Sequence, residues 1–335
     1  MNDKHSMILV TGATGAVGPH IIMALHAAGY QVRTLSLDNP PHDIWPNDVD
    51  VRIGDVTNPV DVQSAMQEIE GVIHLAALLH IVDPPVSLRG MYERVNVHGT
   101  ESVVNAAVEA GVSRLVFFST ITVYGDSAGR ILTEDTPPKP ETFYAQTKYK
   151  AEQIVLAAKQ SDGQPLGTAL RLGAVYGARI KGNYRKLLLA LSKGRFIPIG
   201  DGKNRRTMVY DKDVAQAAVL ALSHPSAAGK IYNVSDGRFH AMDEIIGAMC
   251  RALGKPLPKF SLSAGSARLI AGLLEDGARV LGMQSPIGRS TIDKYTEDIA
   301  VDSQRIQAHL GFASKYDLES GWRETVEHMR SLREL

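Results

Sequence analysis

The most informative segment for the fold is residues 7–18, which read Met-Ile-Leu-Val-Thr-Gly-Ala-Thr-Gly-Ala-Val-Gly. The apolar residues 7–10 are typical of a buried strand. The glycine-rich turn after them opens a helical pattern that runs to about Ala28, with Gly29 as its stop. Glycine lets a backbone turn sharply and approach a pyrophosphate with no Cβ in the way, and free N–H groups at a helix N-terminus attract that anion.

A glycine-rich turn can also be purely structural, so its position matters. Here it lies directly between the first strand and the first helix, which favours a dinucleotide site. The residues of this turn expected to contact a cofactor are Gly12, Thr14, Gly15, Ala16, Val17 and Gly18.

Short apolar runs alternate with helical patterns through the first half of the chain. Strands are expected at residues 32–37, 49–53, 71–75, 114–119 and 168–172, and helices at 59–68, 92–110 and 144–160. Steady alternation of strand and helix indicates a parallel sheet with helices on both faces. We therefore predict an α/β protein with a Rossmann-type, doubly wound parallel sheet.

The rhythm changes after Gly177. Helices are expected at residues 184–194, 211–223, 241–253, 264–282 and 317–331, with strand-like pieces near 207–210 and 230–234. We predict an NAD(P)-binding domain over residues 1–177 and a smaller, mostly helical substrate-binding lobe over 178–335, partly interleaved with the end of the sheet. Segment 264–282 is amphipathic, and we expect it to pack on the protein surface rather than contact a membrane.

Composition narrows the class of protein. The 335 residues include 36 Lys and Arg against 36 Asp and Glu, so the basic excess of a nucleic-acid binder is lacking. No apolar run reaches the roughly 18 residues of a membrane span, and the N-terminus lacks the apolar stretch of a signal peptide. The single cysteine, Cys250, fits a reducing compartment. We expect a cytoplasmic protein without a metal, nucleic-acid or membrane partner.

Other cofactor contacts are expected where the strands end. Asp55, followed by Val56, could accept a hydrogen bond from the adenine amino group; alternatively it caps the helix that begins near Pro59. The fourth strand is followed by Leu75, Ala76 and Ala77. Small residues there allow close approach to the nicotinamide-side ribose, although they also serve simple packing.

The end of the second strand bears on the choice of cofactor. An acidic residue there would bind the adenosine ribose and favour NAD, whereas a nearby arginine would favour NADP. The position is Ser36, and Asp38 could substitute for it after a small loop shift. We expect NAD or NADP, with NAD favoured.

A tyrosine and a lysine share one face of the helix expected at 144–160. Tyr144 and Lys148 stand four residues apart. A free tyrosine, with a pKa near about 10, is a poor base, and a close ammonium favours its phenolate. Such pairs also occur on solvated helices. Thr120 leaves the fifth strand at its carboxyl end, where ligands collect in open α/β sheets, although hydroxyls there also serve turns.

Together these motifs resemble the extended short-chain dehydrogenase/reductase family, of the NAD-dependent epimerase/dehydratase type. The matching segments are Gly12-x-x-Gly15-x-x-Gly18, Asp55-Val56, residues 74–77, Asn96 within Val-Asn-Val-His-Gly-Thr, residues 119–125, Tyr144-x-x-x-Lys148, and residues 171–177 and 200–209. The resemblance implies catalytic roles for Thr120, Tyr144 and Lys148, a cofactor contact for Asn96, and a homodimer.

Within the family, the C-terminal half looks most similar to bacterial nucleotide-sugar 4-epimerases and 4-keto-reductases. The resemblance implies that Arg206 grips the nucleotide's phosphates; its alternative is a surface arginine in a turn. Dehydratases carry Asp-Glu where Ile121-Thr122 stand here, which argues against 4,6-dehydration.

Two further residues are expected to bind substrate. Ala174 stands where epimerases often carry an asparagine, and Asn183 could compensate. His80 is placed to touch substrate or is an ordinary loop histidine.

The sequence thus predicts an oxidoreductase or epimerase that acts at C4 of a nucleotide-activated sugar, with Tyr144 and Thr120 also touching the substrate. One alternative within the family is a 3β-hydroxysteroid or dihydroflavonol dehydrogenase/reductase on a hydrophobic alcohol or ketone. Another is a non-catalytic NAD(P)-sensing regulator, a class that commonly lacks the tyrosine or the lysine.

Overall fold

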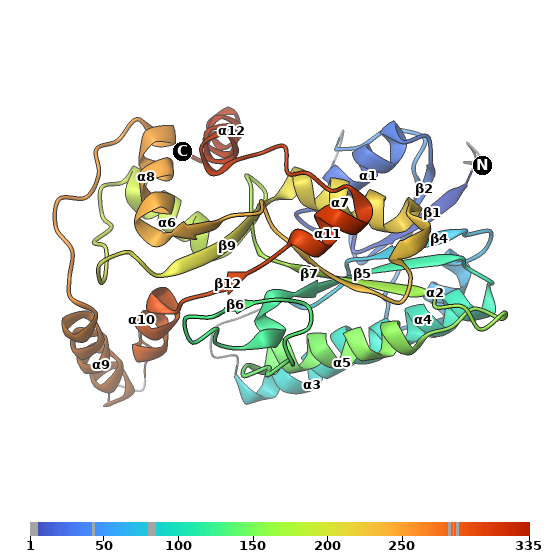
Figure 1. Cartoon of the computed structure of the whole chain (residues 1–335), viewed down its shortest axis with the longest axis horizontal. Helices are drawn as coiled ribbons and strands as arrows, with labels where there is room; N and C mark the ends of the chain where they lie inside the picture. Colours follow the sequence, from blue (N-terminus) through green and yellow to red (C-terminus); the bar gives the residue numbers. More distant parts are fainter. Residues whose placement is uncertain (1–5, 42–43, 80–84, 281–282, 284, 286–287) are drawn as a thin grey trace.

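A seven-stranded parallel sheet forms the centre of the protein (Figure 1). The computed structural model describes residues 6–41, 44–79, 85–280, 283, 285 and 288–335. The strand order is β10-β7-β5-β4-β1-β2-β3, so the chain winds outward in both directions from β1 and confirms the predicted doubly wound sheet. The strands are β1 (Met7–Thr11), β2 (Gln31–Ser36), β3 (Asp50–Ile53), β4 (Gly71–His74), β5 (Arg114–Thr120), β7 (Gly167–Leu172) and β10 (Ile231–Val234).

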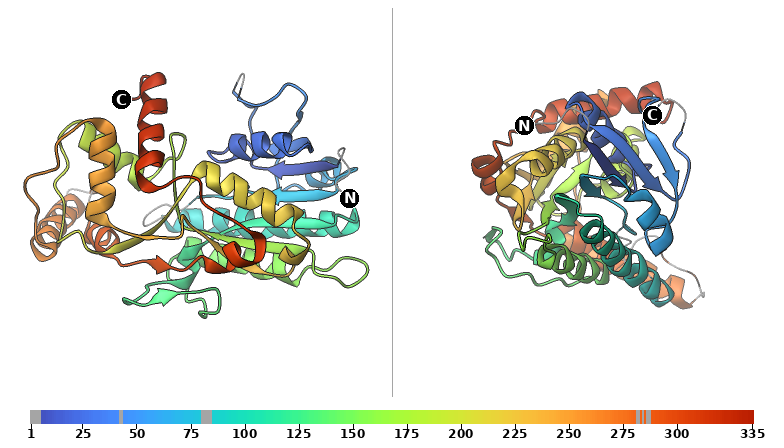
Figure 2. Two further views of the ribbon diagram at one scale, coloured as in Figure 1. Left: turned by 45° about the horizontal axis from the view of Figure 1, so that its top comes forward. Right: turned by 90° about the vertical axis from the view of Figure 1, so that its right-hand side faces the viewer.

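Helices cover both faces of this sheet, as the two views of Figure 2 show. One face carries α1 (Gly18–Ala27), α7 (Asp211–Ser223) and α11 (Gln304–Leu310); the other carries α2 (Pro59–Ala65), α4 (Gly99–Glu109) and α5 (Phe143–Ala157). Ile8 and Val10 pack against the first group and Leu9 against the second. Residues 7–10 of β1 are apolar without a break because both faces of this central strand are covered.

The chain leaves the sheet after β7 and later returns to it. A separate three-stranded sheet consists of β8 (Ala174–Tyr176), β9 (Arg205–Tyr210) and β11 (Phe239–Ala241). Around it, α6 (Asn183–Ser192), α8 (Met242–Leu253) and α12 (Leu318–Ser331) enclose a second core that includes Trp322. Between β9 and β11, α7 packs against α1, and β10 pairs with β7. The chain after residue 177 therefore contributes strands to both the seven-stranded and the three-stranded sheet.

Several elements differ from the sequence prediction. Residues 92–110, expected as one helix, form α3 (Arg89–Tyr92), a π-helix (Glu93–His98) and α4. The prediction also omitted α10 (Arg289–Thr296) and the two-stranded pair β6 (Ile131–Leu132) and β12 (Ala300–Val301). The amphipathic helix α9 runs over Ala264–Val280. Among the described residues, no helix combines the length and apolarity needed to cross a bilayer.

Candidate active site

The turn between β1 and α1 can be built only from glycine at two positions. Gly12 has φ of +68°, and a Cβ there would lie 2.7 Å from the Cα of Ala76. A Cβ on Gly18 would lie 1.9 Å from the carbonyl oxygen of Ala13. The N-cap residue of α1, Val17, makes no side-chain hydrogen bond to the first turn, so the helix N-terminal amides are left for an anion. This cradle fits a pyrophosphate.

Thr14 and Ser36 join the turn to the end of β2. The backbone N–H of Thr14 donates to Ser36 Oγ at 3.3 Å, and Ser36 is buried whereas Asp38 is exposed. The remaining predicted contacts in the turn, Gly15 and Ala16, are partly or fully exposed. The end of β2 and the glycine turn therefore form one continuous wall.

Asp55 organises its own turn at the end of β3. Its Oδ1 accepts from Thr57 N at 2.8 Å, and its N–H donates to Asp61 Oδ2 at 2.9 Å. The cap of α2 is Asn58, whose side chain accepts from Val60 N, so the alternative role of Asp55 as the helix cap is wrong. The next residue, Val56, is buried in the core beneath α2 and α4.

Asn96, placed by the π-helix, fixes the segment after β4. Its Oδ1 accepts from Leu78 N at 2.7 Å, while Nδ2 donates to Leu78 O and to Thr147 Oγ1, both at 3.2 Å. This buried amide thus joins the segment to α5. The first three residues of this segment, Leu75, Ala76 and Ala77, are each half-buried.

One face of α5 lies along β5. Tyr144, Lys148 and Glu152 follow one another at intervals of four residues on this helix. The Nζ of Lys148 lies 4.0 Å from the centre of the Phe117 ring of β5. Thr120 is the last residue of β5, and its Oγ1 accepts from the backbone N–H two residues later, at 3.2 Å. The structure therefore brings the lysine to the strand that ends in the threonine.

Burial favours the neutral forms of the ionisable groups on this face. It lowers the pKa of Lys148 to about 7, although the charge of Glu152 acts in the opposite direction. Burial, reinforced by Tyr92, raises the pKa of Tyr144 above its ordinary value. Burial and the nearby Lys148 lower the pKa of His74 to about 3. A positive charge close to the phenol would lower its pKa and favour the phenolate.

Sequence reasoning missed a buried ion pair beneath this face. Glu152 accepts from Ser119 Oγ at 2.6 Å and from Arg171 through Nε at 3.0 Å and Nη2 at 2.5 Å. The guanidinium of Arg171 also lies over the ring of Tyr124, 4.6 Å from its centre. The pair holds the residue just before Thr120 against α5. Glu152 stands four residues after Lys148 on the same helix face, but the sequence has no signal that pairs it with Arg171.

Arg206 is buried within β9, not in a surface turn before a strand. It pairs across the antiparallel ladder with His240. The strand therefore begins at Arg205, two residues before the start expected from the sequence. Its Nη2 donates to the carbonyls of Lys294 and Tyr295 at 2.5 and 3.0 Å, near the C-terminal end of α10. Arg205 faces elsewhere and pairs with Asp298. The alternative of a surface arginine is therefore wrong, and Arg206 has a structural contact as well.

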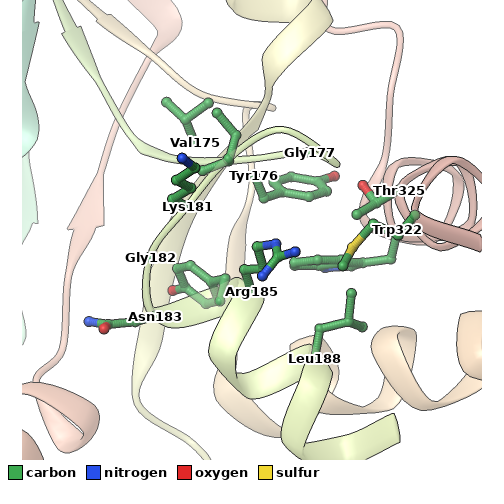
Figure 3. Close-up of a pocket in the computed structure, with 13 residues that line it drawn as sticks. Val175, Tyr176, Gly177, Lys181, Gly182, Asn183, Arg185, Leu188, Trp322 and Thr325 are labelled. Atoms are coloured by element: carbon green, nitrogen blue, oxygen red, sulfur yellow. The ribbon is translucent and has the colours of Figure 1, made fainter. Parts of the chain in front are cut away.

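The remaining two substrate candidates lie apart from these groups. Asn183 begins α6 and is exposed; Figure 3 shows it directed away from Tyr176, Arg185 and Trp322. The cavity of about 50 Å³ among those residues has room for a few water molecules, not a nucleotide. His80 lies outside the described residues.

Comparison with known proteins extends over the whole chain. Residues 8–235 match the model of the "NAD dependent epimerase/dehydratase family". A UDP-glucose 4-epimerase from Vibrio cholerae is 28% identical over 331 residues, covering 96% of this chain and 94% of that protein. An N-acetyl-alpha-D-glucosaminyl-diphospho-ditrans,octacis-undecaprenol 4-epimerase from Escherichia coli O157:H7 is 25% identical over 329 residues, covering 98% and 96%.

A relative of different specificity and a solved structure complete the comparison. A 3-beta-hydroxysteroid dehydrogenase from Mycolicibacterium neoaurum is 28% identical over 267 residues, covering 76% of this chain and 72% of that protein. The structure of MoeE5 in complex with UDP-glucose and NAD has a TM-score of 0.77 and 27% identity, covering 98% of this chain and 100% of that one. The chain belongs to the NAD-dependent epimerase/dehydratase family.

Proposed function

We propose that this chain moves hydride at C4 of a nucleotide-activated hexose, as a 4-epimerase or a 4-keto-reductase. The observation that carries the proposal is the α5 face, where Tyr144 and Lys148 lie along the strand that ends in Thr120. Alcohol oxidation needs a base, a charge to support it and a donor to the reacting oxygen. The sugar is supported by the relatives named for UDP-glucose and for a diphospho-linked sugar.

In the proposed mechanism, Tyr144 as phenolate takes the proton of the C4 hydroxyl. Lys148 as ammonium supports the phenolate, and Thr120 donates a hydrogen bond to the reacting oxygen. A nicotinamide cofactor held by the glycine turn and Lys148 would supply the acceptor for the C4 hydride and a positive charge beside the phenol. Reduction of the ketone on its other face gives the epimer; reduction of an incoming 4-keto sugar gives the reductase reaction.

The cofactor preference is expected to respond to the end of β2. Ser36→Asp keeps an acceptor for Thr14 N and adds a carboxylate that repels a 2′-phosphate. Because like charges in contact cost several kcal/mol, the ratio of kcat/KM for NADP over NAD should fall about tenfold or more. Steady-state kinetics with both cofactors measure the ratio. Ser36→Asn is the uncharged control, and a ratio that moves equally in both variants contradicts a ribose site at this residue.

The nucleotide-sugar assignment depends on Arg206. A pyrophosphate-linked sugar brings two negative charges. Nη1 of this arginine lies 4.0 Å from Glu297 Oε2, and Nε has no hydrogen-bond partner among the described residues. Removing one member of a buried charge-assisted contact costs roughly 2–5 kcal/mol. Arg206→Ala should therefore raise the Kd for a UDP-hexose at least about tenfold, with NAD(H) affinity unchanged. Calorimetric titration of the NADH-bound protein measures both constants.

Two further variants separate binding from the support of α10. Arg206→Gln can still donate to the α10 carbonyls but has no charge, so it should lose sugar affinity with little loss of Tm. Arg205→Ala removes a neighbouring charge that is engaged by Asp298 and should leave sugar affinity unchanged. Equal UDP-hexose binding by wild type and Arg206→Ala would move the hydrophobic-alcohol alternative ahead.

A sugar on a lipid diphosphate carrier is a second candidate substrate. It satisfies the same requirement for a diphosphate at Arg206, and one relative is named for such a substrate. The specific observation that favours it is α9, which packs on the helix that Arg206 holds and exposes leucines to solvent. The presence of both Tyr144 and Lys148 supports an enzyme over a non-catalytic regulator.

A further inference from the structure

An exposed apolar surface covers the end of the C-terminal half. It comprises Leu257, Phe260, Leu262, Leu269, Ile270, Leu273 and Leu274, and is called here the α9 apolar surface. Phe260 is 82% exposed and Leu273 67%. Figures 1 and 2 show α9 at the opposite end of the molecule from β1. Its residues come from two neighbouring stretches of sequence, 257–262 and α9, and α9 lies far from the seven-stranded sheet.

The helix is attached by its other side. Ala267 and Ala271 are buried against Ile292 of α10, with Ile199 at the edge of this small core. Arg268 pairs with Asp293 of α10 at 2.8 Å. The inner face of α9 thus has its partner, and the leucine face remains uncovered while the helix is held in place.

On the helices that cover the seven-stranded sheet, exposed apolar residues stand singly. Val60 on α2 is 70% exposed and Met23 on α1 is 50% exposed, and each stands on a separate helix. Single apolar residues of this kind are normal on a protein surface, whereas a contiguous apolar patch marks an interaction site. The α9 apolar surface therefore calls for a partner.

The charges beside this surface specify what kind of partner fits. Lys255 and Lys259 flank Leu257 and Phe260, and neither lysine is ion-paired with any described residue. The two acids of α9, Glu275 and Asp276, are both engaged by Arg289 of α10, at 3.4 and 2.7 Å. What remains unpaired next to the apolar side chains is positive charge.

A hollow on α9 combines the same two chemistries. Its volume is about 330 Å³, and its walls are Gly265, Arg268, Leu269, Leu273 and Arg289. Both arginines are already engaged by acids, Arg268 by Asp293 and Arg289 by Asp276, so the hollow mainly offers its leucines, and the positive charge open to an anionic head comes from Lys255 and Lys259. A neutral hydrophobic ligand would use the leucines only, and a second copy of this surface would bring the unpaired lysines together.

We propose, against the expectation from the sequence, that the α9 apolar surface docks on an anionic lipid bilayer. Phe260 and the leucines of α9 enter the boundary between headgroups and acyl chains, while Lys255 and Lys259 meet anionic headgroups. Docking on the plane of a membrane requires no spanning helix. It places α10, and with it Arg206, close to the bilayer, although the docking itself does not depend on the reaction catalysed.

Vesicle co-sedimentation with the full chain tests the proposal. Wild-type protein should partition onto vesicles of phosphatidylglycerol and phosphatidylcholine at least tenfold more strongly than onto phosphatidylcholine alone. Phe260→Ser combined with Leu273→Ser should reduce partitioning onto the mixed vesicles at least tenfold. Lys255→Gln combined with Lys259→Gln should remove the preference for phosphatidylglycerol, as should high salt, because headgroup attraction is screened.

Val60→Ser is the matched control, because Val60 is as exposed as Leu273 but stands alone on α2. It should bind vesicles as wild type does. Since all these side chains are exposed, the variants should melt at the wild-type temperature. Lack of vesicle binding at every phosphatidylglycerol fraction overturns the proposal. So does a dimer in sedimentation velocity that Leu273→Ser dissociates while vesicles stay unbound, since a second copy then covers the surface.

Discussion

Tyr144→Phe is expected to lower kcat by roughly 10²–10⁴-fold while NAD(H) affinity changes little. The substitution removes only the phenolic oxygen that carries the substrate proton. The ring keeps its place beside Tyr92, whose ring centre lies 6.4 Å away. Turnover at saturating substrate and the Kd of NADH, measured by fluorescence titration, separate the chemical step from cofactor binding.

Tyr149→Phe provides a matched control on the same helix. Tyr149 packs against a small apolar cluster away from the Tyr144 face, so the loss of its hydroxyl should leave kcat unchanged. A Tyr144→Phe enzyme that retains most of the wild-type kcat contradicts the assigned role of the phenol. An equal fall in NADH affinity and kcat would point to damage of the site as a whole.

Lys148→Met is expected to lower cofactor affinity and to move the rising limb of the pH–rate profile to higher pH. Ionised Tyr144 and protonated Lys148 stabilise each other's charge, so without the lysine a higher pH is needed to form the phenolate. We expect a kcat loss of roughly 10²-fold at pH 7. Initial rates between pH 6 and 10, compared at saturating cofactor, measure the displacement.

The same variant also makes a prediction about stability. Lys148 has a pKa of about 7 in the folded chain against an ordinary 10.5, so below pH 7 folding must bury its charge. Between these values the unfolded chain binds the extra proton, and wild-type stability therefore rises with pH. Lys148→Met should be more stable than wild type by about 3–5 kcal/mol at pH 6, and this gain should vanish near pH 10.

Lys150→Met controls for the loss of a lysine from α5. Lys150 is exposed and pairs with Glu93 at 2.7 Å, so its removal should leave both the pH–rate profile and the pH dependence of unfolding unchanged. Denaturant unfolding of the cofactor-free proteins at several pH values gives the comparison. A Lys148→Met gain that is constant with pH would mean that the lysine has the same pKa in the folded and unfolded chains and keeps its charge on folding.

The fold was predictable where the sequence pattern has a single structural solution. The strand, glycine turn and helix of residues 7–27 were found because only that order explains apolar residues followed by Gly12. The π-helix Glu93–His98 was not predicted, because a helical pattern does not distinguish hydrogen bonds over four residues from those over five. Yet Asn96 lies in this π-helix, and the wider turn is part of the segment that places its side chain against Leu78.

The site was only partly predictable, because several of its contacts are between distant segments. The helix α10 was missed since Ile292 is its one buried residue, too few for a periodic pattern. The contact from Arg206 to the carbonyls of α10 could not be foreseen without that helix. Arg171 stood within a recognised motif, but its partner Glu152 is identified only once α5 lies against β7.

The return of the chain to its first sheet has a consequence during synthesis. A nascent chain that ends at Gly177 contains β7 but neither β10, which pairs with it, nor α7, which covers α1. Until about 234 residues have left the ribosome, β7 has an unpaired edge, and until α7 is made the apolar side chains of α1 are covered only by the strands beneath them. The seven-stranded sheet therefore cannot be completed before much of the second core has been translated. Partly folded chains of this kind expose apolar surface and strand edges, which are what chaperones bind.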